Sequence, residues 1–233
     1  CFPFAGGSAS AFTSWVKELS DEIEVVIYQP PGRGTRFNER PHQDMYTVMD
    51  ELLKHVDFIT SVPYILFGHS LGSRTAYELA CRLKVAGQLL PSYLVASGSE
   101  PPHIPKKRAR IDLLSDDEFI EELKLLNGTP ATVLENQELL SIFLPAIRSD
   151  FKLAFEYKGI ATIMPFPILV LNGDSDPNVE PQHCLLWQEL SEKELTFEEL
   201  QGDHFFINTN RTELLVIINR TINKVLANLQ HKL

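Results

Sequence analysis

The sequence predicts an α/β fold in which a mostly parallel central sheet is flanked by helices. Short apolar runs typical of buried parallel strands alternate with longer segments whose apolar residues recur at helical spacing. Parallel strands need crossover connections, and the helical segments supply them. With 233 residues, 44% of them hydrophobic, the chain can bury one large core, so we expect a single domain over residues 1–233.

The first 60 residues are expected to hold two strands and two helices. Residues 1–4 are typical of a strand end that runs into a glycine-rich loop, and Ser10 is placed to cap a helix through Leu19. Residues 24–29 form a compact apolar run of the buried-strand type. From residue 42 to residue 60 the apolar positions fit one face of a long helix: Met45, Val48, Met49, Leu52, Leu53, Val56 and Ile59.

The next two strands enclose a helix. Residues 63–67 form an apolar strand, and a helical pattern begins near Ser73 and is ended by Gly87. Residues 93–96 are the following strand. Between the first of these strands and the helix stands Gly68-His69-Ser70-Leu71-Gly72.

Residues 103–160 are predicted to form a helical insertion. Ser115 to Glu118 is typical of a capped helix start with acids in its first turn, and residues 127–130 interrupt the pattern. A second helix is expected to continue past Asp150 through Phe155. Because the segment lies between two strands and contains no strand pattern, we expect it to cover the sheet as a helical lid.

The last third restores the alternating pattern. Residues 167–171 and 195–200 are expected as strands, and a final helix is expected over residues 211–229, capped by Thr209 or Asn210. We therefore predict a mostly parallel sheet with right-handed connections.

Ser70 is the candidate nucleophile. It occupies a Gly-x-Ser-x-Gly turn between a strand and a helix, where a strained backbone lifts the hydroxyl above the sheet edge. The flanking glycines make room where two backbones crowd together. The alternative is a serine in an ordinary turn. His69, beside it, is expected to be a packing or hydrogen-bonding neighbour.

Two further candidates follow later strand ends. In a parallel sheet, ligands bind outside the carboxyl ends of the strands, and Ser70, Asp176 and His204 all follow such ends. The order Ser, Asp, His is that of an α/β-hydrolase. His204 would move the proton of Ser70, and an acid would orient its ring. Asp174 and Asp176 share one turn, so either remains a candidate, and structural roles for the acids and for His204 are the alternative.

An acyl-transfer site also needs donors for the oxyanion. The amide of Leu71, just after the nucleophile, is one candidate, and the loop at Ala5-Gly6-Gly7 is placed to supply the second through the Ala5 amide. The alternative for this loop is a plain glycine turn.

The composition excludes several classes of function. A formal charge of −10 disfavours nucleic acid and anionic membranes as partners. Three widely spaced cysteines build neither a disulfide framework nor a metal site, which favours a cytoplasmic setting. The histidines show no metal-ligand spacing, the glycine loops are not phosphate fingerprints, and no apolar run or leader signals a membrane segment or export. We therefore expect neither a metal nor a cofactor in this chain.

Motifs along the chain resemble those of the type II thioesterases that accompany non-ribosomal peptide and polyketide synthases, together with the external medium-chain fatty-acyl thioesterases. In chain order they are Phe2-Pro3-Phe4-Ala5-Gly6-Gly7-Ser8, Pro31-Gly32-Arg33-Gly34, Gly68-His69-Ser70-Leu71-Gly72, Leu114-Ser115-Asp116, Asn127-Gly128-Thr129-Pro130, Arg148-Ser149-Asp150 and Gly202-Asp203-His204-Phe205-Phe206. The elbow is common to many hydrolases, whereas the Pro-Gly-Arg-Gly loop and the Gly-Thr-Pro and Arg-Ser-Asp segments of the insertion are more specific.

The resemblance implies roles for individual residues. It implies that Ser70 and His204 are catalytic, that Asp176 rather than Asp174 is the acid, and that Ala5 and Leu71 line the oxyanion hole. The implied substrate is an acyl thioester on the phosphopantetheine arm of an acyl or peptidyl carrier protein, and the arm belongs to that partner. The implied task is the removal of stalled or mis-primed acyl groups by a monomeric enzyme.

A basic run in this acidic protein is the candidate docking site for the carrier. Lys106, Lys107, Arg108 and Arg110 precede the first lid helix and could meet the phosphate of the arm or an acidic carrier surface; a solvated loop is the alternative. A free-standing carboxylesterase or an acyl-transferring cyclase would use the same triad, and a non-catalytic synthase-docking protein would not need it.

Overall fold

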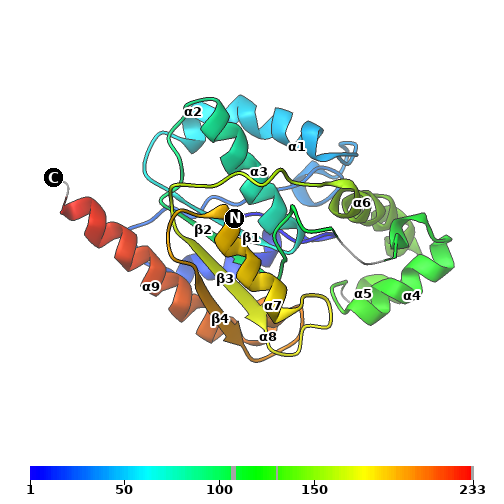
Figure 1. Ribbon diagram of the computed structural model, residues 1–233. Helices are drawn as coiled ribbons and strands as arrows, with labels where there is room; N and C mark the ends of the chain where they lie inside the picture. The colour runs from blue at the N-terminus through cyan, green and yellow to red at the C-terminus, as the bar shows by residue number, and fades with distance from the viewer. Residues whose placement is uncertain (106–108, 130, 232–233) are drawn as a thin grey trace.

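Four parallel strands form the sheet of the computed structural model, which describes residues 1–105, 109–129 and 131–231 (Figure 1). They are β1 (Ile65–His69), β2 (Tyr93–Ser97), β3 (Ile168–Gly173) and β4 (Thr196–Leu200), in the spatial order β1-β2-β3-β4. Each pairs in parallel with the next. The predicted parallel sheet is thus confirmed, and all four carboxyl ends lie along one edge.

The expected strand over residues 24–29 is wrong. Phe2 forms a parallel bridge with Gly68 of β1, and the chain at Tyr28 donates a backbone hydrogen bond to the Cys1 carbonyl at 3.0 Å. The segment thus lies beside a very short strand piece, with too few ladder hydrogen bonds to form a regular strand. Val26 is 48% exposed, so the run is also not buried.

The helix expected from Ser10 consists of two 3₁₀ turns, η1 (Ala9–Ala11) and η2 (Thr13–Lys17). Ser8, not Ser10, is the cap, because its hydroxyl oxygen accepts from the Ser10 amide. Residues 12–16 are rich in aromatic, β-branched and serine residues, which are weak α-helix formers. The buried Phe12 and Trp15 hold this segment by packing instead.

The long helix expected over residues 42–60 is divided. It comprises α1 (Met45–Leu52), a 3₁₀ turn η4 (Leu53–His55) and α2 (Val56–Ile59). Asp44 caps α1 by accepting from the Thr47 amide at 2.8 Å. The next helix, α3 (Leu71–Val85), begins directly after Ser70, and Gly87 follows its end with a φ of +64°.

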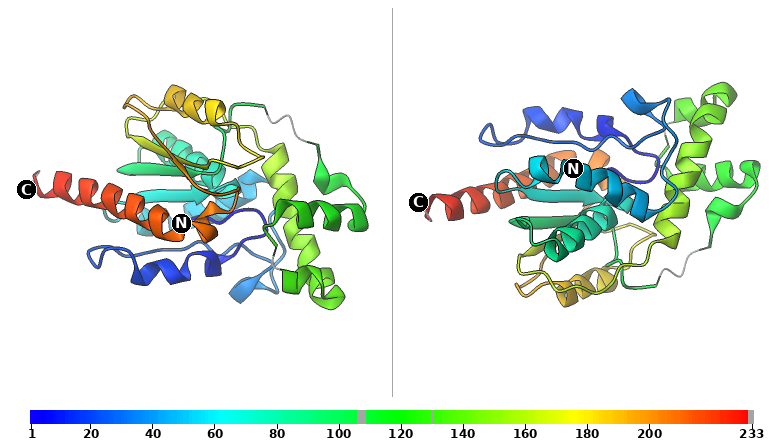
Figure 2. Two further views of the ribbon diagram at one scale, coloured as in Figure 1. Left: turned by 90° about the horizontal axis from the view of Figure 1, so that it is seen from below. Right: turned by 90° about the horizontal axis from the view of Figure 1, so that it is seen from above.

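Between β2 and β3 the described residues contain helices and no strand, as expected. They are η5 (Ile111–Leu113), α4 (Asp116–Leu126), α5 (Ala131–Leu134) and α6 (Gln137–Glu156). Ser115 and Glu118 form a complete capping box at the start of α4, which confirms the predicted cap. These helices lie beyond one end of the sheet, with a small apolar core of their own (Figure 2).

The C-terminal part adds α7 (Pro181–Cys184), η6 (Leu185–Leu190), α8 (Phe206–Thr209) and α9 (Arg211–Gln230). The expected caps of the last helix are wrong. Thr209 belongs to α8, and the Asn210 side chain donates to Glu213 without accepting from the helix. Because α8 leads straight into α9, Asn210 lacks the extended backbone that a capping side chain requires.

Alternate residues of the strands fill two apolar layers. Leu94 and Ala96 of β2 face the layer that contains α1, α3 and η6, whereas Val95 faces the layer that contains η1, η2 and α9. Figure 2 shows α3 and η6 on one face of the sheet and η1, η2 and α9 on the other. No helix within the described ranges is long and apolar enough to cross a membrane.

Candidate active site

The backbone at Ser70 is strained. Its φ of 55° and ψ of −113° lie outside the regions that non-glycine residues favour, and its amide donates to the Ser97 carbonyl at 2.8 Å. A Cβ at Gly68 would lie 2.1 Å from the Gly72 oxygen, and a Cβ at Gly72 would lie 2.0 Å from the Phe2 oxygen. Both glycines are therefore required for this close approach, which turns the chain sharply from β1 into α3.

His204 and Asp176 meet at the same edge of the sheet. The Nδ1 of His204 lies 2.6 Å from Oδ2 of Asp176, and the side chains are 12% and 0% exposed. The other carboxylate oxygen of Asp176 accepts from the Asn178 amide at 2.7 Å. This buried carboxylate thus fixes the ring of His204 and favours the tautomer with its proton on Nδ1.

The neighbouring acids have other partners. Asp174 accepts from the Gly202 amide at 3.0 Å and from the Ser175 hydroxyl at 2.9 Å, and these donors lower the pKa of its carboxyl. Asp203 accepts from the Phe205 amide. Of the two acids that the sequence left open, the structure brings only Asp176 to His204.

His69 links the elbow to His204 by packing. Its ring centroid lies 5.1 Å from that of His204, and its Nδ1 lies 2.9 Å from the Ser97 hydroxyl. Burial, and next the charge of His204, lower the pKa of His69 well below its usual 6.5, so His69 is neutral. A Cβ at Gly98 would lie 2.6 Å from the His69 ring and 3.4 Å from the His204 ring, so a glycine is needed beside both.

The two expected oxyanion donors lie beside the elbow. Leu71 is the first residue of α3, and Ala5 lies in a turn that the Gly7 amide closes onto the Phe4 carbonyl at 2.8 Å. Within the described part of the chain, neither the Leu71 amide nor the Ala5 amide donates to a protein acceptor. Both are free to receive an oxyanion, and the dipole of α3 favours negative charge at Leu71.

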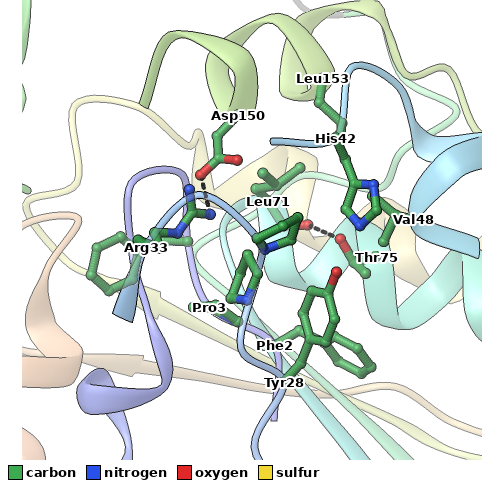
Figure 3. Close-up of a pocket in the computed structure, with 13 residues that line it drawn as sticks. Phe2, Pro3, Tyr28, Arg33, His42, Val48, Leu71, Thr75, Asp150 and Leu153 are labelled. Carbon is green, nitrogen blue, oxygen red and sulfur yellow. Dashed lines mark hydrogen bonds and ion pairs between the residues drawn. The ribbon is translucent and has the colours of Figure 1, made fainter. Parts of the chain in front are cut away.

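A buried ion pair near the elbow was missed by the sequence analysis. Arg33 Nη2 lies 2.6 Å from Asp150 Oδ2, and Figure 3 shows the pair near Leu71. All three residues line a cavity of about 30 Å³. Both residues stood in recognised motifs, but a separation of 117 positions gave no sign that they meet. The same holds for Phe205, whose ring would collide with a Cβ at Gly128 of the inserted segment, 2.2 Å away.

Three of the four expected docking residues are not among those that the structure describes. Lys106, Lys107 and Arg108 lie outside the residues that the structure describes. Arg110 is paired with two acids of the protein. Its guanidinium lies 2.6 Å from Asp112 and 3.0 Å from Glu156, so its charge is compensated within the protein.

Within the described ranges, no group of three or more His, Cys, Asp or Glu residues is placed to hold a metal ion.

Comparison with known proteins places this geometry in a family. The family model "Thioesterase domain" matches residues 1–222. Gramicidin S biosynthesis protein GrsT of Aneurinibacillus migulanus is 35% identical over 231 residues, which cover 97% of this chain and 89% of that protein. The crystal structure of ClbQ from the colibactin NRPS/PKS pathway superposes with a TM-score of 0.91 at 32% identity and 97% coverage of both chains.

A second solved structure agrees. The type II thioesterase BorB from the borrelidin biosynthetic cluster gives a TM-score of 0.85 at 34% identity, covering 94% of this chain and 90% of that one. The strained serine elbow and the four-stranded parallel sheet are thus set in a chain that matches thioesterases over nearly its whole length. This protein belongs to the thioesterase domain family, and it is a thioester hydrolase with the α/β-hydrolase fold.

Proposed function

We propose that this protein is a type II thioesterase that removes stalled or mis-primed acyl groups from the phosphopantetheine arm of a synthase's carrier protein. The observation that carries the proposal is the contact between Asp176 and His204 at the sheet edge where Ser70 stands. The names of the relatives support the substrate class, since GrsT is named for gramicidin S biosynthesis and BorB as a type II thioesterase.

Each triad residue has a distinct role in this proposal. The Ser70 oxygen attacks the thioester carbonyl, and His204 takes the serine proton through Nε2 and gives it to the departing thiol. Asp176 stabilises the ring while it is charged. Water then attacks the acyl-serine, with His204 as general base, and frees the acid.

The oxyanion of both tetrahedral intermediates is assigned to the amides of Ala5 and Leu71. Loss of one such donor typically costs about 3 kcal/mol of transition-state stabilisation. The unoccupied state of both amides in the described structure supports this role. The neutral His69 adds no second positive charge beside His204 that would oppose protonation of the catalytic ring.

The helices of residues 103–160 are proposed as a lid within a single domain that spans residues 1–233. Two contacts support this. Asp150 of α6 accepts from the Gly6 amide of the oxyanion loop, and Gly128 lies against the ring of Phe205, next to His204. A carrier arm must pass beneath these helices to reach Ser70, so their positions govern access.

The partner is proposed to be an acyl or peptidyl carrier domain, and the phosphopantetheine belongs to that partner, so this chain needs no cofactor. The enzyme is proposed to act as a cytoplasmic monomer; its three cysteines, all free, suit a reducing compartment. Lys106, Lys107 and Arg108 remain the proposed docking residues. Reversal of their charges is expected to raise KM for a carrier thioester but not for a small thioester, and equal effects on both would contradict docking at this site.

The decisive experiment follows an acyl-loaded carrier by mass spectrometry before and after incubation with the enzyme. We expect the parent protein to restore the free phosphopantetheine mass, and Ser70→Ala to leave the acyl carrier intact. Persistent hydrolysis by Ser70→Ala would disprove the mechanism. Comparable kcat/KM values for an oxygen ester and the carrier thioester would point to a general carboxylesterase, and a cyclic product would point to an acyl-transferring cyclase.

A further inference from the structure

One carboxylate of the inserted helices is bound to the loop that carries the Ala5 amide. Asp150 lies on α6, and its Oδ2 accepts from the Gly6 amide at 2.8 Å and from Arg33 Nη2 at 2.6 Å. The side chains of Arg33 and Asp150 are only 6% and 10% exposed. A single oxygen atom therefore joins three segments that lie far apart in the sequence. Figure 3 shows its contact with Arg33.

One turn of α6 also packs directly on the loop that contains Gly6 and on the loop that contains Gly32. A Cβ at Gly6 would lie 3.5 Å from Ile147, and a Cβ at Gly32 would lie 3.3 Å from Ala146. The Ser149 hydroxyl donates to the His42 carbonyl at 2.6 Å. The contact at Asp150 is thus part of a close fit between α6 and the loops beside the elbow.

Arg33 and Asp150 are buried together, and each is the main charged partner of the other. Burial raises the pKa of the Asp150 carboxyl, and the Arg33 guanidinium and the Gly6 amide act against that rise. The Nε and Nη1 atoms of Arg33 are buried and have no hydrogen-bond partner among the described residues, so Asp150 is its principal contact. Removal of either partner would leave the other as a buried, unpaired charge. The folded protein therefore strongly favours the conformation in which Arg33 and Asp150 are in contact.

The conformation of the Phe4–Gly7 turn explains why an amide, and not a carbonyl oxygen, faces the Asp150 carboxylate. The Gly7 amide closes a turn onto the Phe4 carbonyl, and Gly6 at the third position has a φ of +80°. That φ is typical of a type II turn, whose central peptide is turned over relative to a type I turn. Because the N–H and C=O of a trans peptide point in opposite directions, the opposite orientation would aim the Ala5 carbonyl oxygen at the Asp150 carboxylate.

We infer that Asp150, held by Arg33, is a positioning residue that fixes the Phe4–Gly7 turn against α6 through the Gly6 amide and so holds the neighbouring Ala5 amide in place for the oxyanion. Docking of α6 and assembly of the oxyanion hole are then one event. The inference deepens the proposed function, since it rests on the assignment of the Ala5 amide as an oxyanion donor.

The test measures transition-state binding apart from substrate binding. Asp150→Asn and Arg33→Met are compared with a control, Arg36→Met. Arg36 belongs to the same loop as Arg33, but its guanidinium pairs with Glu39 and Glu51. Kinetics are measured on a small acyl thioester that needs no carrier. The Ki of a thioester-mimicking trifluoromethyl ketone, whose serine adduct bears an oxyanion, is measured beside the Kd of its methylene analogue, which forms none.

We expect Asp150→Asn to lower kcat by about 10- to 100-fold with KM nearly unchanged, because a misplaced catalytic group costs that much. The Ki of the trifluoromethyl ketone should rise by a similar factor, and the Kd of the methylene analogue should stay constant. Arg36→Met should leave all four values near those of the parent. An effect of Asp150→Asn no larger than that of Arg36→Met, or a rise in KM alone, would overturn the inference.

If Asp150→Asn does not fold, the arginine variants decide the question. Arg33→Met is expected to lower kcat and weaken the trifluoromethyl ketone, and Arg33→Lys to restore part of both. Parent-like values for Arg33→Met would refute the positioning role. These assays involve no carrier, so a failure of the carrier proposal, or retained hydrolysis by Ser70→Ala, is recognised separately.

Discussion

Asp176 and His204, 28 positions apart in the chain, meet at 2.6 Å between carboxylate Oδ2 and imidazole Nδ1. The contact joins the turn after β3 to the turn after β4, and both turns lie at the edge where Ser70 follows β1. Because Asp174 is bound to Gly202 and Ser175 instead, the pair identifies which of two neighbouring acids serves the histidine.

The first prediction separates these two acids. Asp176→Asn is expected to lower kcat by about 10⁴-fold, because the amide favours the wrong tautomer of His204 and does not stabilise its charged form. Asp174→Asn removes only a turn contact and should leave kcat close to that of the parent. Steady-state hydrolysis of a small acyl thioester checks both variants, and a larger loss in Asp174→Asn would show that the assignment is reversed.

The second prediction concerns the glycines of the elbow. Gly72→Ala is expected to lower the free energy of unfolding by about 3 kcal/mol, because its Cβ would lie 2.0 Å from the Phe2 oxygen. Gly87→Ala is the matched control. Its Cβ would meet nothing within 4 Å, so it should cost only about 1 kcal/mol, for its left-handed backbone. Urea unfolding measures both, and equal costs would rule out the steric explanation.

A third prediction follows from the lowered pKa of His69. Below about pH 6.5 the unfolded chain binds a proton at His69 that the folded protein excludes, so the free energy of unfolding falls as the pH falls. One such group contributes at most about 1.4 kcal/mol per pH unit. The sign is that of a base whose folded pKa is depressed: its contribution is present above pH 6.5 and is lost below it.

The variant His69→Asn tests this origin, since an amide can still contact the Ser97 hydroxyl but does not titrate. Between pH 7 and pH 5.5 its unfolding free energy should fall less steeply than that of the parent. His55→Asn, at an exposed position, should keep the parental slope. The slopes are compared by urea unfolding at each pH, and parallel slopes for His69→Asn and the parent would contradict the prediction.

The fourth prediction concerns the stability of the inserted helices. Ser115→Ala removes both hydrogen bonds of the Ser115 hydroxyl, which accepts from the Glu118 amide and donates to the Glu118 carboxylate, and is expected to destabilise α4 by about 1 kcal/mol. Faster amide hydrogen exchange across residues 116–126 should report this change. Ser141→Ala, which removes a hydroxyl that donates to the Glu138 carbonyl of its own helix, is the control and should leave exchange in α4 unchanged.

Local patterns were sufficient for much of the fold. Three apolar runs became β1 to β3 because buried parallel strands need continuous apolar sequence, and the capping box at Ser115 formed because its partners are three residues apart. Residues 24–29 show the limit. Their residues are those of a typical strand, but a regular strand also needs a neighbouring strand with which to form backbone hydrogen bonds. The segment beside them is too short for that, and sequence periodicity does not report the length of a neighbouring strand.

The sequence alone determined the elbow at Ser70 and the order in which an acid and His204 follow it, since glycine spacing and strand ends are local properties. The tertiary structure decided the choice of Asp176 over Asp174, the neutral state of His69, and the meeting of Asp150 with Arg33 and Gly6. The physical reason is that hydrogen bonds and burial depend on distances across the fold, and the chain closes those distances only when its strands and helices have packed.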